Sequence, residues 1–339
     1  MALNFQDGKN IVIFRPGAIG DTLLDTPLIR ALKENFPHSK IIYFSKKPSI
    51  EILKYNKNVI PVEFSFMNLL RVRSYFKPTI FMDLKGNAIS VIASRISGAK
   101  YRAGIFKEGR KRYYNVHIYP PFGKIHYTVY HRLEFLRPLG IDPMMVSIDT
   151  EFPYPEEYIE NMKKNLEESG VKGFFFISHI RLDLPHRAWD IEKFCSFFKE
   201  LKKKYPYPIL LAWEPSTLRL LEPILNCAPV RLAPSTKSLF DLGALMRLAG
   251  VYFGSDSGPK HIAVSQGTPT FALFFTELPE AWTPPDPRHS YAWKGLPCQP
   301  CWSKTCKFGT FDCIHKLTPE EVMKRFEKFL LKIERDRGF

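Results

Sequence analysis

The sequence predicts an α/β protein of two domains, each a doubly wound parallel sheet, and three observations support this. The chain has 339 residues, more than a single hydrophobic core usually serves. Short apolar runs alternate with amphipathic stretches of helical length, and this alternation occurs twice. Between the two series, Pro143, Pro153 and Pro155 interrupt the pattern, so we expect the domain boundary near residue 150.

The apolar runs and amphipathic stretches give the expected elements in order. In the first half we expect strands at 11–14, 40–44 and 79–82, with a helix that runs to about residue 36 and another at 88–97. In the second half we expect strands at 174–178, 209–213, 230–232, 251–254 and 270–274, and helices at 191–204, 217–225, 239–248 and 260–265. A last helix at 319–334 would bury one face, made of Val322, Phe326, Phe329, Leu330 and Ile333. Ligands of parallel sheets bind at the carboxyl ends of the strands, so the loops after the strands are the candidate sites.

The positive charge is concentrated in the first half of the chain. Residues 1–150 hold 23 basic and 11 acidic side chains, a net charge of +12, whereas residues 151–339 hold 26 and 23, a net charge of +3. This asymmetry predicts an anionic partner for the first half, either nucleic acid, a membrane surface or a phosphorylated substrate. We expect no nucleic-acid partner, because no zinc-finger or RNP1 pattern is present. Without an apolar run of membrane-spanning length or a signal peptide, we expect a cytoplasmic protein.

The six cysteines fall into two groups. Cys195 and Cys227 stand alone and are expected to be buried filler residues. The other four are crowded in one segment with the spacing C-x2-C-x4-C-x6-C: Cys298, Cys301, Cys306 and Cys313. Such a cluster indicates a structural metal site, although the spacing matches neither a zinc ribbon nor a standard iron–sulfur motif. Disulfides within the loop and free thiols are the alternatives.

The first chemical motif follows the first strand and opens a helix. It reads Arg15-Pro16-Gly17-Ala18-Ile19-Gly20-Asp21-Thr22 and is neither G-x-G-x-x-G nor a Walker A sequence. Its glycines allow a backbone turn to approach a ligand closely. Asp21 then stands at the start of the helix, either as a functional carboxylate or as an ordinary helix cap.

Two further motifs lie in the second half. The first follows a strand and opens a helix: Gly254-Ser255-Asp256-Ser257-Gly258-Pro259-Lys260-His261. Free amides at a helix start bind phosphate, and the concentration of Ser, Gly, Lys and His favours a diphosphate site over an ordinary capped helix. The segment 179–189 also follows a strand and carries two histidines and two arginines. Arginine matches phosphate oxygens by its planar fork, and the alternative is a solvated basic loop.

Four segments together resemble a known family, the ADP-heptose–lipopolysaccharide heptosyltransferases of glycosyltransferase family nine. They are IVIFRPGAIGDTLLDTPLIRALKENFP, DLKGNAISVIASRISGAKYRAGI, GSDSGPKHIAVSQGTPTFALF and CQPCWSKTC, and the resemblance extends from about residue 10 to residue 330. It implies the GT-B fold, in which two Rossmann-like domains face a cleft. Residues 1–150 would bind the lipid A–inner-core acceptor, residues 151–318 the nucleotide-sugar, and residues 319–339 would form a C-terminal helix.

The resemblance also implies roles for individual residues, with Asp21 as the catalytic base. Matching the family's donor-binding positions gives Arg187, Asp256, Ser257, Gly258, Lys260, His261 and Glu214. The acceptor-side positions are Gly17, Gly20, Thr22, Lys85, Arg110, Lys111 and Arg112. Two departures stand out: Arg187 replaces a lysine, and His179-Ile180-Arg181 replaces a loop of small residues, which points to another donor sugar or a divergent site.

The activity implied by the resemblance is transfer of a heptose from ADP-heptose to the inner core of lipopolysaccharide, with inversion and with no required cofactor. The enzyme would be peripheral on the inner face of the cytoplasmic membrane, with the basic run at 107–112 facing anionic lipid. The alternatives are a family member that uses another nucleotide-sugar and a non-catalytic binding module of the same fold.

Overall fold

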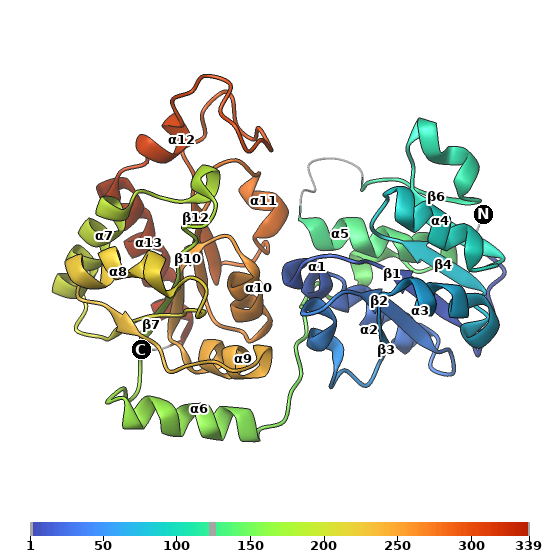
Figure 1. The fold of residues 1–339 in the computed structure, drawn as a ribbon, viewed down its shortest axis with the longest axis horizontal. Helices are drawn as coiled ribbons and strands as arrows, with labels where there is room; N and C mark the ends of the chain where they lie inside the picture. The colour runs from blue at the N-terminus through green and yellow to red at the C-terminus, as the bar shows by residue number, and fades with distance from the viewer. Residues whose placement is uncertain (1–2, 122–126, 338–339) are drawn as a thin grey trace. The chain divides into compact units, whose positions relative to one another are not determined.

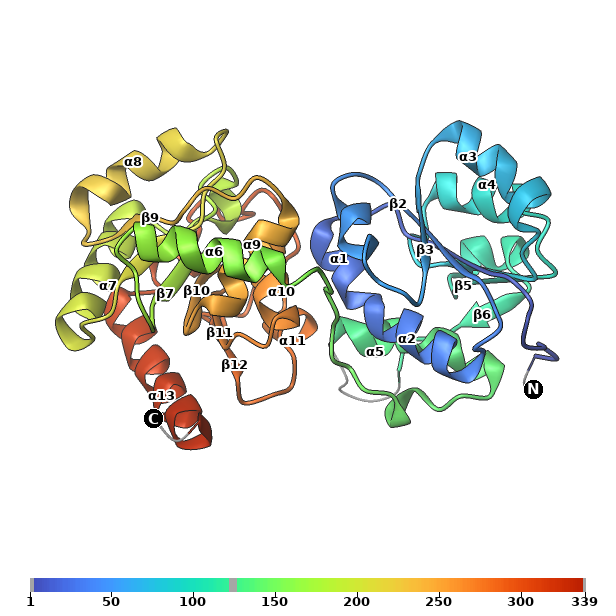
Figure 2. The same ribbon diagram turned by 90° about the horizontal axis from the view of Figure 1, so that it is seen from below.

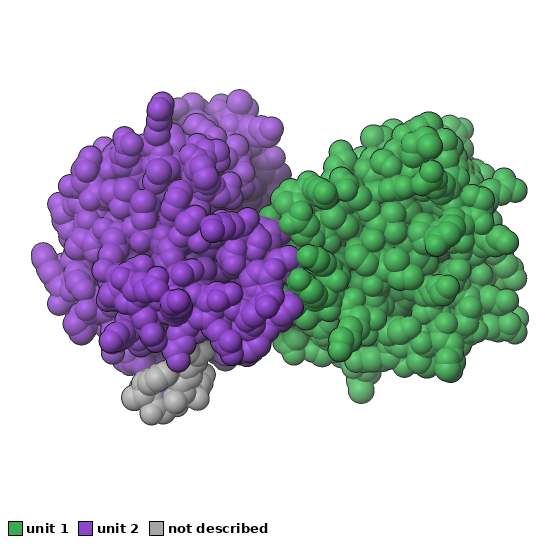
Figure 3. Space-filling model, turned by 60° about the horizontal axis from the view of Figure 1, so that its bottom comes forward, with its two compact units in different colours: residues 1–154 green, residues 155–339 purple. Residues whose placement is uncertain are grey.

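A computed structural model describes residues 3–121 and 127–337. The chain divides into two compact units, residues 1–154 and 155–339, which Figure 3 colours separately. In the described part of each unit, six strands form one sheet, and all of the strand pairs are parallel. The two sheets have the same strand order when each is counted from its own first strand, and this is the Rossmann order.

In unit 1 the sheet order is β3-β2-β1-β4-β5-β6, and helices cover both faces (Figure 2). The strands are β1 (Ile11–Phe14), β2 (Ile41–Ser45), β3 (Ile60–Glu63), β4 (Ile80–Asp83), β5 (Tyr101–Ile105) and β6 (Val116–Ile118). The helices are α1 (Ile19–Leu24), α2 (Thr26–Asn35), α3 (Phe66–Arg71), α4 (Ala88–Ile96) and α5 (Thr128–Leu133), with short turns η1 (Ser49–Leu53), η2 (Val72–Phe76), η3 (Glu108–Tyr113), η4 (Glu134–Leu139) and η5 (Pro143–Met145). Because side chains alternate along a strand, Val12 and Phe14 share one face, where they pack with Leu69 of α3 and Ala93 of α4.

Unit 2 repeats this architecture with the order β12-β11-β10-β7-β8-β9 (Figure 1). The strands are β7 (Phe176–His179), β8 (Ile209–Leu211), β9 (Arg231–Leu232), β10 (Val251–Ser255), β11 (Thr270–Leu273) and β12 (His289–Ala292). The helices are α6 (Glu157–Glu168), α7 (Ile191–Lys204), α8 (Leu218–Cys227), α9 (Leu239–Leu248), α10 (Gly258–Ser265), α11 (Pro279–Trp282), α12 (Asp312–His315) and α13 (Pro319–Arg337), with the turn η6 (Pro185–Arg187).

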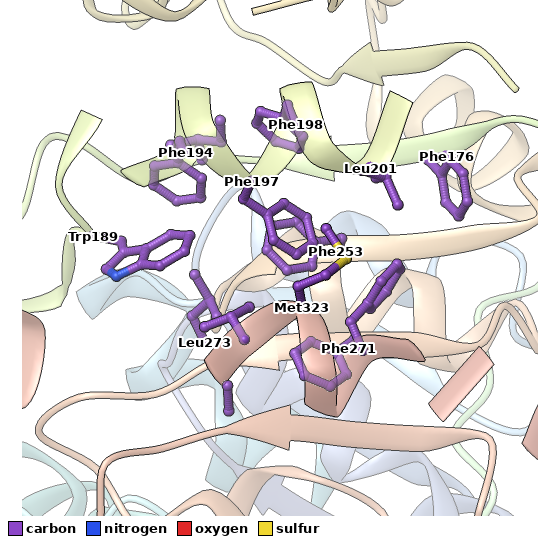
Figure 4. Close-up of a cluster of buried hydrophobic side chains, with 14 of the residues drawn as sticks. Phe176, Trp189, Phe194, Phe197, Phe198, Leu201, Phe253, Phe271, Leu273 and Met323 are labelled. Carbon is purple, nitrogen blue, oxygen red and sulfur yellow. The ribbon is translucent and has the colours of Figure 1, made fainter. Parts of the chain in front are cut away.

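The core of unit 2 is rich in aromatic side chains (Figure 4). Phe197 of α7 stacks on Phe253 of β10, with ring centroids 4.1 Å apart. Phe326 of α13 packs edge-on against the same Phe253 ring. The predicted apolar face of the last helix is therefore buried in this core, and α13 completes unit 2.

The structure differs from the sequence prediction at the first helix, which is broken at Asp25 into α1 and α2. Pro27 has no backbone N–H, and the Thr26 hydroxyl donates to the Leu23 carbonyl at the break, 2.7 Å away. The strands β3, β5, β6 and β12 were not predicted, because short strands at or next to a sheet edge mix polar and apolar residues.

The expectation for Cys195 and Cys227 was also wrong. These residues form a disulfide that joins α7 to α8, with their Cα atoms 5.7 Å apart. They are far apart in the sequence, so only the packing of the two helices reveals the pair.

Candidate active site

The turn between β1 and α1 places Asp21 in the first turn of the helix. Oδ2 of Asp21 accepts a hydrogen bond from the amide of Ala18, 3.2 Å away, so Asp21 does satisfy a free amide at the helix start. A Cβ atom on Gly17 would lie 2.8 Å from the same oxygen. Only glycine therefore allows the turn to fold this tightly over the carboxylate.

Asp21 belongs to a buried network of charges in unit 1. The guanidinium of Arg15 donates to Oδ1 of Asp21, and Nη2 of Arg132 lies 3.8 Å from that oxygen. Arg132 also pairs with Asp25 at 3.1 Å, and the Tyr43 hydroxyl donates to Asp25 at 2.7 Å. Burial alone would raise the pKa of Asp21, but the two arginines and the Ala18 amide outweigh it, so the pKa lies below its usual value. Asp21 is therefore a carboxylate at neutral pH.

The turn after β4 lies beside the Asp21 turn, because β4 is the neighbour of β1 in the sheet. Nη1 of Arg15 donates to the Leu84 carbonyl and thereby connects the two turns. Asp83 accepts hydrogen bonds from the backbone amides of Lys85 and Gly86 at 2.9 and 2.8 Å. The Lys85 side chain is exposed. The polar side chains at this edge are thus held by the backbone of two adjacent loops.

The other predicted acceptor-side residues fall into two groups. Arg110 reaches the turn after β4, because Nη1 lies 3.5 Å from where a Cβ on Gly86 would stand. Lys111 is paired with Glu108, and Arg112 lies over the Tyr113 ring, so both belong to the surface of η3. Gly20 and Thr22 are buried, so Thr22 faces the interior and the expected contact of its side chain with an acceptor is not available.

In unit 2, the turn between β10 and α10 carries the second motif. Ser257 is the N-cap of α10, and Pro259 occupies the first turn of the helix. A Cβ on Gly254 would lie 2.4 Å from the carbonyl oxygen of His179, so glycine lets β10 approach β7 closely. Nδ1 of His179 in turn contacts the Ser257 hydroxyl at 3.0 Å. Burial and the nearby Arg181 lower the pKa of His179 to about 4, so the ring is neutral at pH 7.

Asp256 is the centre of a buried ionic cluster at this turn. Its Oδ1 atom accepts from the ammonium of Lys260 at 2.6 Å and lies 3.8 Å from Nε2 of His261. Its Oδ2 atom lies 3.4 Å from Nη2 of Arg187, which also pairs with Glu277 at 2.7 Å. Burial would raise the pKa of Asp256, but Lys260, His261 and Arg187 together lower it below the usual value.

The two cations of this cluster differ in what they offer to a ligand. The Lys260 side chain is 1% exposed, and its ammonium also donates to the Trp282 carbonyl at 2.7 Å. The Arg187 side chain is 23% exposed. The sequence led us to expect direct contact between Lys260 and a phosphate, but the side chain is too buried for a ligand to reach it in this structure. Lys260 therefore holds Asp256 in place, and Arg187 is the cation that a ligand can reach.

Glu214 lies in the loop after β8, next to β7 in the sheet, and its side chain is exposed.

Four charged residues of the two networks were given no role by the sequence reasoning: Arg15, Asp25, Arg132 and Glu277. Glu277 follows β11 and could have been found only by its place after a strand, whereas Arg132 lies in a helix far along the chain.

The four loop cysteines line one cavity of about 730 Å³ in unit 2. All four are free thiols, so the expected alternative of disulfides within the loop is wrong. Within residues 3–121 and 127–337, no three His, Cys, Asp or Glu side chains converge in a way that could hold a metal ion. Cys301 is exposed and Cys313 is buried, and a structural role for the four thiols stays a prediction.

The fold defines the class of the protein: two Rossmann-type units, each with a parallel sheet of six strands, as in GT-B glycosyltransferases. The chain belongs to glycosyltransferase family 9 (heptosyltransferase), whose family model matches residues 66–311, and it is a glycosyltransferase.

Relatives and solved structures agree with this assignment. Lipopolysaccharide heptosyltransferase 3 of Escherichia coli K12 is 27% identical over 291 residues, which is 78% of this chain and 82% of the relative. A family 9 glycosyltransferase from Veillonella parvula superposes with a TM-score of 0.78 at 20% identity, covering 96% of this chain and 98% of that one. The E. coli heptosyltransferase WaaC, solved with ADP, has a TM-score of 0.67 at 16% identity, with coverage of 95% and 98%.

Proposed function

We propose that this enzyme transfers a heptose from ADP-heptose to the inner core of lipopolysaccharide, with inversion at the anomeric carbon. The observation that carries the proposal is the pair of sites: a fixed carboxylate in unit 1, and a helix start with an accessible arginine in unit 2. The relatives are named as lipopolysaccharide heptosyltransferases, and a solved neighbour carries ADP, which supports this choice of donor and acceptor.

Asp21 is the general base of the proposed reaction. Its carboxylate accepts the proton of an acceptor hydroxyl as that oxygen attacks the anomeric carbon. The arginines that keep Asp21 ionised also lower its basicity, so its advantage lies in being correctly placed and unprotonated at neutral pH. Proton transfer then proceeds as the hydroxyl becomes acidic in the transition state. The rate should therefore show no acid limb attributable to Asp21 near neutral pH.

The start of α10 and Arg187 bind the diphosphate of the donor. The N-terminus of α10 at Ser257 offers a ligand backbone amides that lack partners within the helix, and the helix dipole favours negative charge there. Arg187 neutralises the charge that develops on the departing ADP. Because these groups supply positive charge themselves, the proposed mechanism requires no cofactor, while Asp256, Lys260 and Glu277 fix the arginine and the turn.

The acceptor is the lipid A–inner-core molecule, which carries phosphates and carboxylates. Lys85 and Arg110 lie at the carboxyl ends of the strands, as Asp21 does, and are cations that unit 1 offers to the acceptor. We place the enzyme on the cytoplasmic face of the inner membrane, where a lipid-linked acceptor and a soluble nucleotide-sugar meet.

One observation favours a second candidate, a different nucleotide-sugar. His179 contacts Ser257 at the helix start, where the resemblance led us to expect small residues. A ring at this position changes the space beside the donor. The two candidates are separated by the thermal stabilisation that nucleotides confer, because a ligand that binds the native state raises Tm. We expect ADP to raise Tm more than UDP or GDP at equal concentration, and the reverse order would favour the second candidate.

A further inference from the structure

Six large apolar side chains are exposed on two neighbouring helical segments of unit 1. α3 and its continuation η2 lie beside α4 in both ribbon views (Figures 1 and 2). The exposed residues, which we call the α3–α4 surface, are Phe66, Met67, Leu70, Tyr75, Ile89 and Ile92. Phe66 is 68% exposed and Tyr75 is 77% exposed, so these rings are in water rather than at the margin of the core.

The fold itself does not need apolar residues at these positions. α4 packs on the sheet through small side chains, Ser90, Ala93 and Ser94, while Ile89 and Ile92 point outward. In α3 the buried residue is Leu69. Polar side chains at the outer positions would cost the core nothing, and several large apolar side chains exposed on neighbouring helices are typical of a binding site.

The charges around the α3–α4 surface have one sign. Between residues 64 and 100 the single acidic residue is Asp83. It is buried, and its carboxylate accepts hydrogen bonds from the Tyr114 hydroxyl and two backbone amides. The exposed charged side chains of this stretch are all basic: Arg71, Arg73, Lys77, Lys85, Arg95 and Lys100. Nη2 of Arg95 donates to the carbonyl of Arg112 at 2.8 Å, so the basic run of η3 adjoins the end of α4.

We propose that the α3–α4 surface docks on an anionic lipid bilayer, with its apolar side chains in the headgroup–acyl boundary and its basic rim on the lipid phosphates. Apolar residues bordered by Lys and Arg are the pattern that binds such interfaces, because burial and charge attraction add. A second copy of the chain fits poorly, since two faces with the same basic rim repel each other. No described helix is long and apolar enough to cross a membrane.

This inference rests on the proposed function only for the reason why the enzyme binds a membrane, which is to meet a lipid-linked acceptor. The test is co-sedimentation of the full chain with vesicles of phosphatidylglycerol and phosphatidylcholine, compared with phosphatidylcholine alone. The variant Phe66→Ser/Met67→Ser/Ile92→Ser removes apolar area without touching the core. The matched control, Met144→Ser/Met145→Ser/Leu331→Ser, removes exposed apolar side chains elsewhere.

We expect the α3–α4 variant to bind anionic vesicles about tenfold more weakly than wild type or worse, and the control to stay within about twofold. Replacing Lys107, Arg110, Lys111 and Arg112 with Gln should weaken vesicle binding mainly at low salt. The replacement removes only the electrostatic part of the binding free energy, and salt screens that part. Wild-type binding to both vesicle types alike, or equal binding by wild type and the α3–α4 variant, would overturn the proposal. So would a wild-type dimer in lipid-free solution that the same variant dissociates.

Activity on a lipid-free oligosaccharide acceptor separates this inference from the proposed function. The α3–α4 variant should keep the wild-type turnover on that acceptor, while its vesicle binding is lost. Asp21→Asn should show the opposite pattern, with vesicle binding kept and turnover lost. Loss of turnover on the lipid-free acceptor in the α3–α4 variant would show that the surface belongs to the reaction itself and would contradict a docking role.

Discussion

The ammonium of Lys260 lies 2.6 Å from Oδ1 of Asp256, and both side chains are buried at the start of α10. Burial lowers the pKa of Lys260, and the pairing with Asp256 opposes that shift. A lysine that seemed from the sequence to be a phosphate ligand is thus a support for the turn. Its partner, Asp256, also contacts Arg187, so the lysine positions the arginine indirectly.

The pairing predicts a large loss of stability when Lys260 alone is changed. Lys260→Met leaves the Asp256 carboxylate buried without its main partner, and the free energy of unfolding should fall by about 3–5 kcal/mol. The double variant Lys260→Met/Asp256→Asn should recover most of this loss, because no uncompensated charge remains. Urea denaturation of the three proteins measures both effects. Equal stability of Lys260→Met and wild type would mean that the pair contributes nothing.

Arg187 is predicted to bind the donor diphosphate directly. Arg187→Ala should weaken ADP binding by about 1.5–3 kcal/mol, the range for hydrogen bonds to charged groups. Arg288→Ala is the control, because Arg288 pairs with Asp286 in the exposed loop before β12. Isothermal titration calorimetry gives both affinities. If ADP affinity is unchanged in Arg187→Ala, the arginine has no place in the donor site.

His179 makes the stability of unit 2 depend on pH. Burial first, and Arg181 second, lower the pKa of the ring from 6.5 to about 4. Below pH 6.5 the unfolded chain takes up a proton that the folded chain does not, so stability is full above this pH and falls as the pH approaches 4. The loss should reach about 3 kcal/mol for this group.

The measurement is urea denaturation from pH 7 to pH 4.5 of wild type and His179→Gln, a variant that retains a hydrogen-bonding group beside Ser257. The variant should show a flatter dependence in this window. His38→Gln, in an exposed turn of unit 1, serves as the control and should follow wild type. Parallel curves for wild type and His179→Gln would show that the ring is not held neutral by the fold.

The loop cysteines should differ in reactivity. Backbone amides, chiefly those of Phe311 and Phe308, lower the pKa of Cys306, whereas burial and the neighbouring thiols raise the pKa of Cys313 to about 11. The thiolate is the reactive form, so near neutral pH Cys306 should be alkylated first and Cys313 last. Peptide mapping by mass spectrometry after brief iodoacetamide treatment gives the order, and metal analysis of the same sample gives the metal content. One bound metal per chain, with all four thiols protected, would reverse this account and support a structural metal site.

The sequence was sufficient for the parts of the fold that local pattern determines. The buried strand β1 is a continuous apolar run and β10 begins with one. Ser257 followed by Pro259 indicates a helix start without any knowledge of the rest of the chain. The position of Asp21 after a strand was visible for the same reason. These features depend on neighbours in the chain, so periodicity and cap preferences reveal them.

The ionic partners of those residues depend on tertiary packing, so they could not be predicted from the sequence. Arg132 meets Asp21 only because α5 packs beside α1 and α2. Glu277 reaches Arg187 across the sheet edge, and Lys260 is buried by its contact with Trp282. The sequence predicted which residue types gather at the strand ends, but not which charges would neutralise one another.

Heptose transfer is measured by incubating the full chain with ADP-heptose and a lipid-free inner-core oligosaccharide, and by following ADP release together with the mass of the acceptor. We expect the acceptor to gain one heptose and one ADP to be released for each transfer. In Asp21→Asn, turnover should fall by roughly 10²–10⁴-fold with ADP affinity little changed, because the variant keeps the size of the side chain and removes the base. ADP release without a heavier acceptor, or turnover within a few-fold of wild type in Asp21→Asn with only a lower Tm, would contradict the proposed reaction.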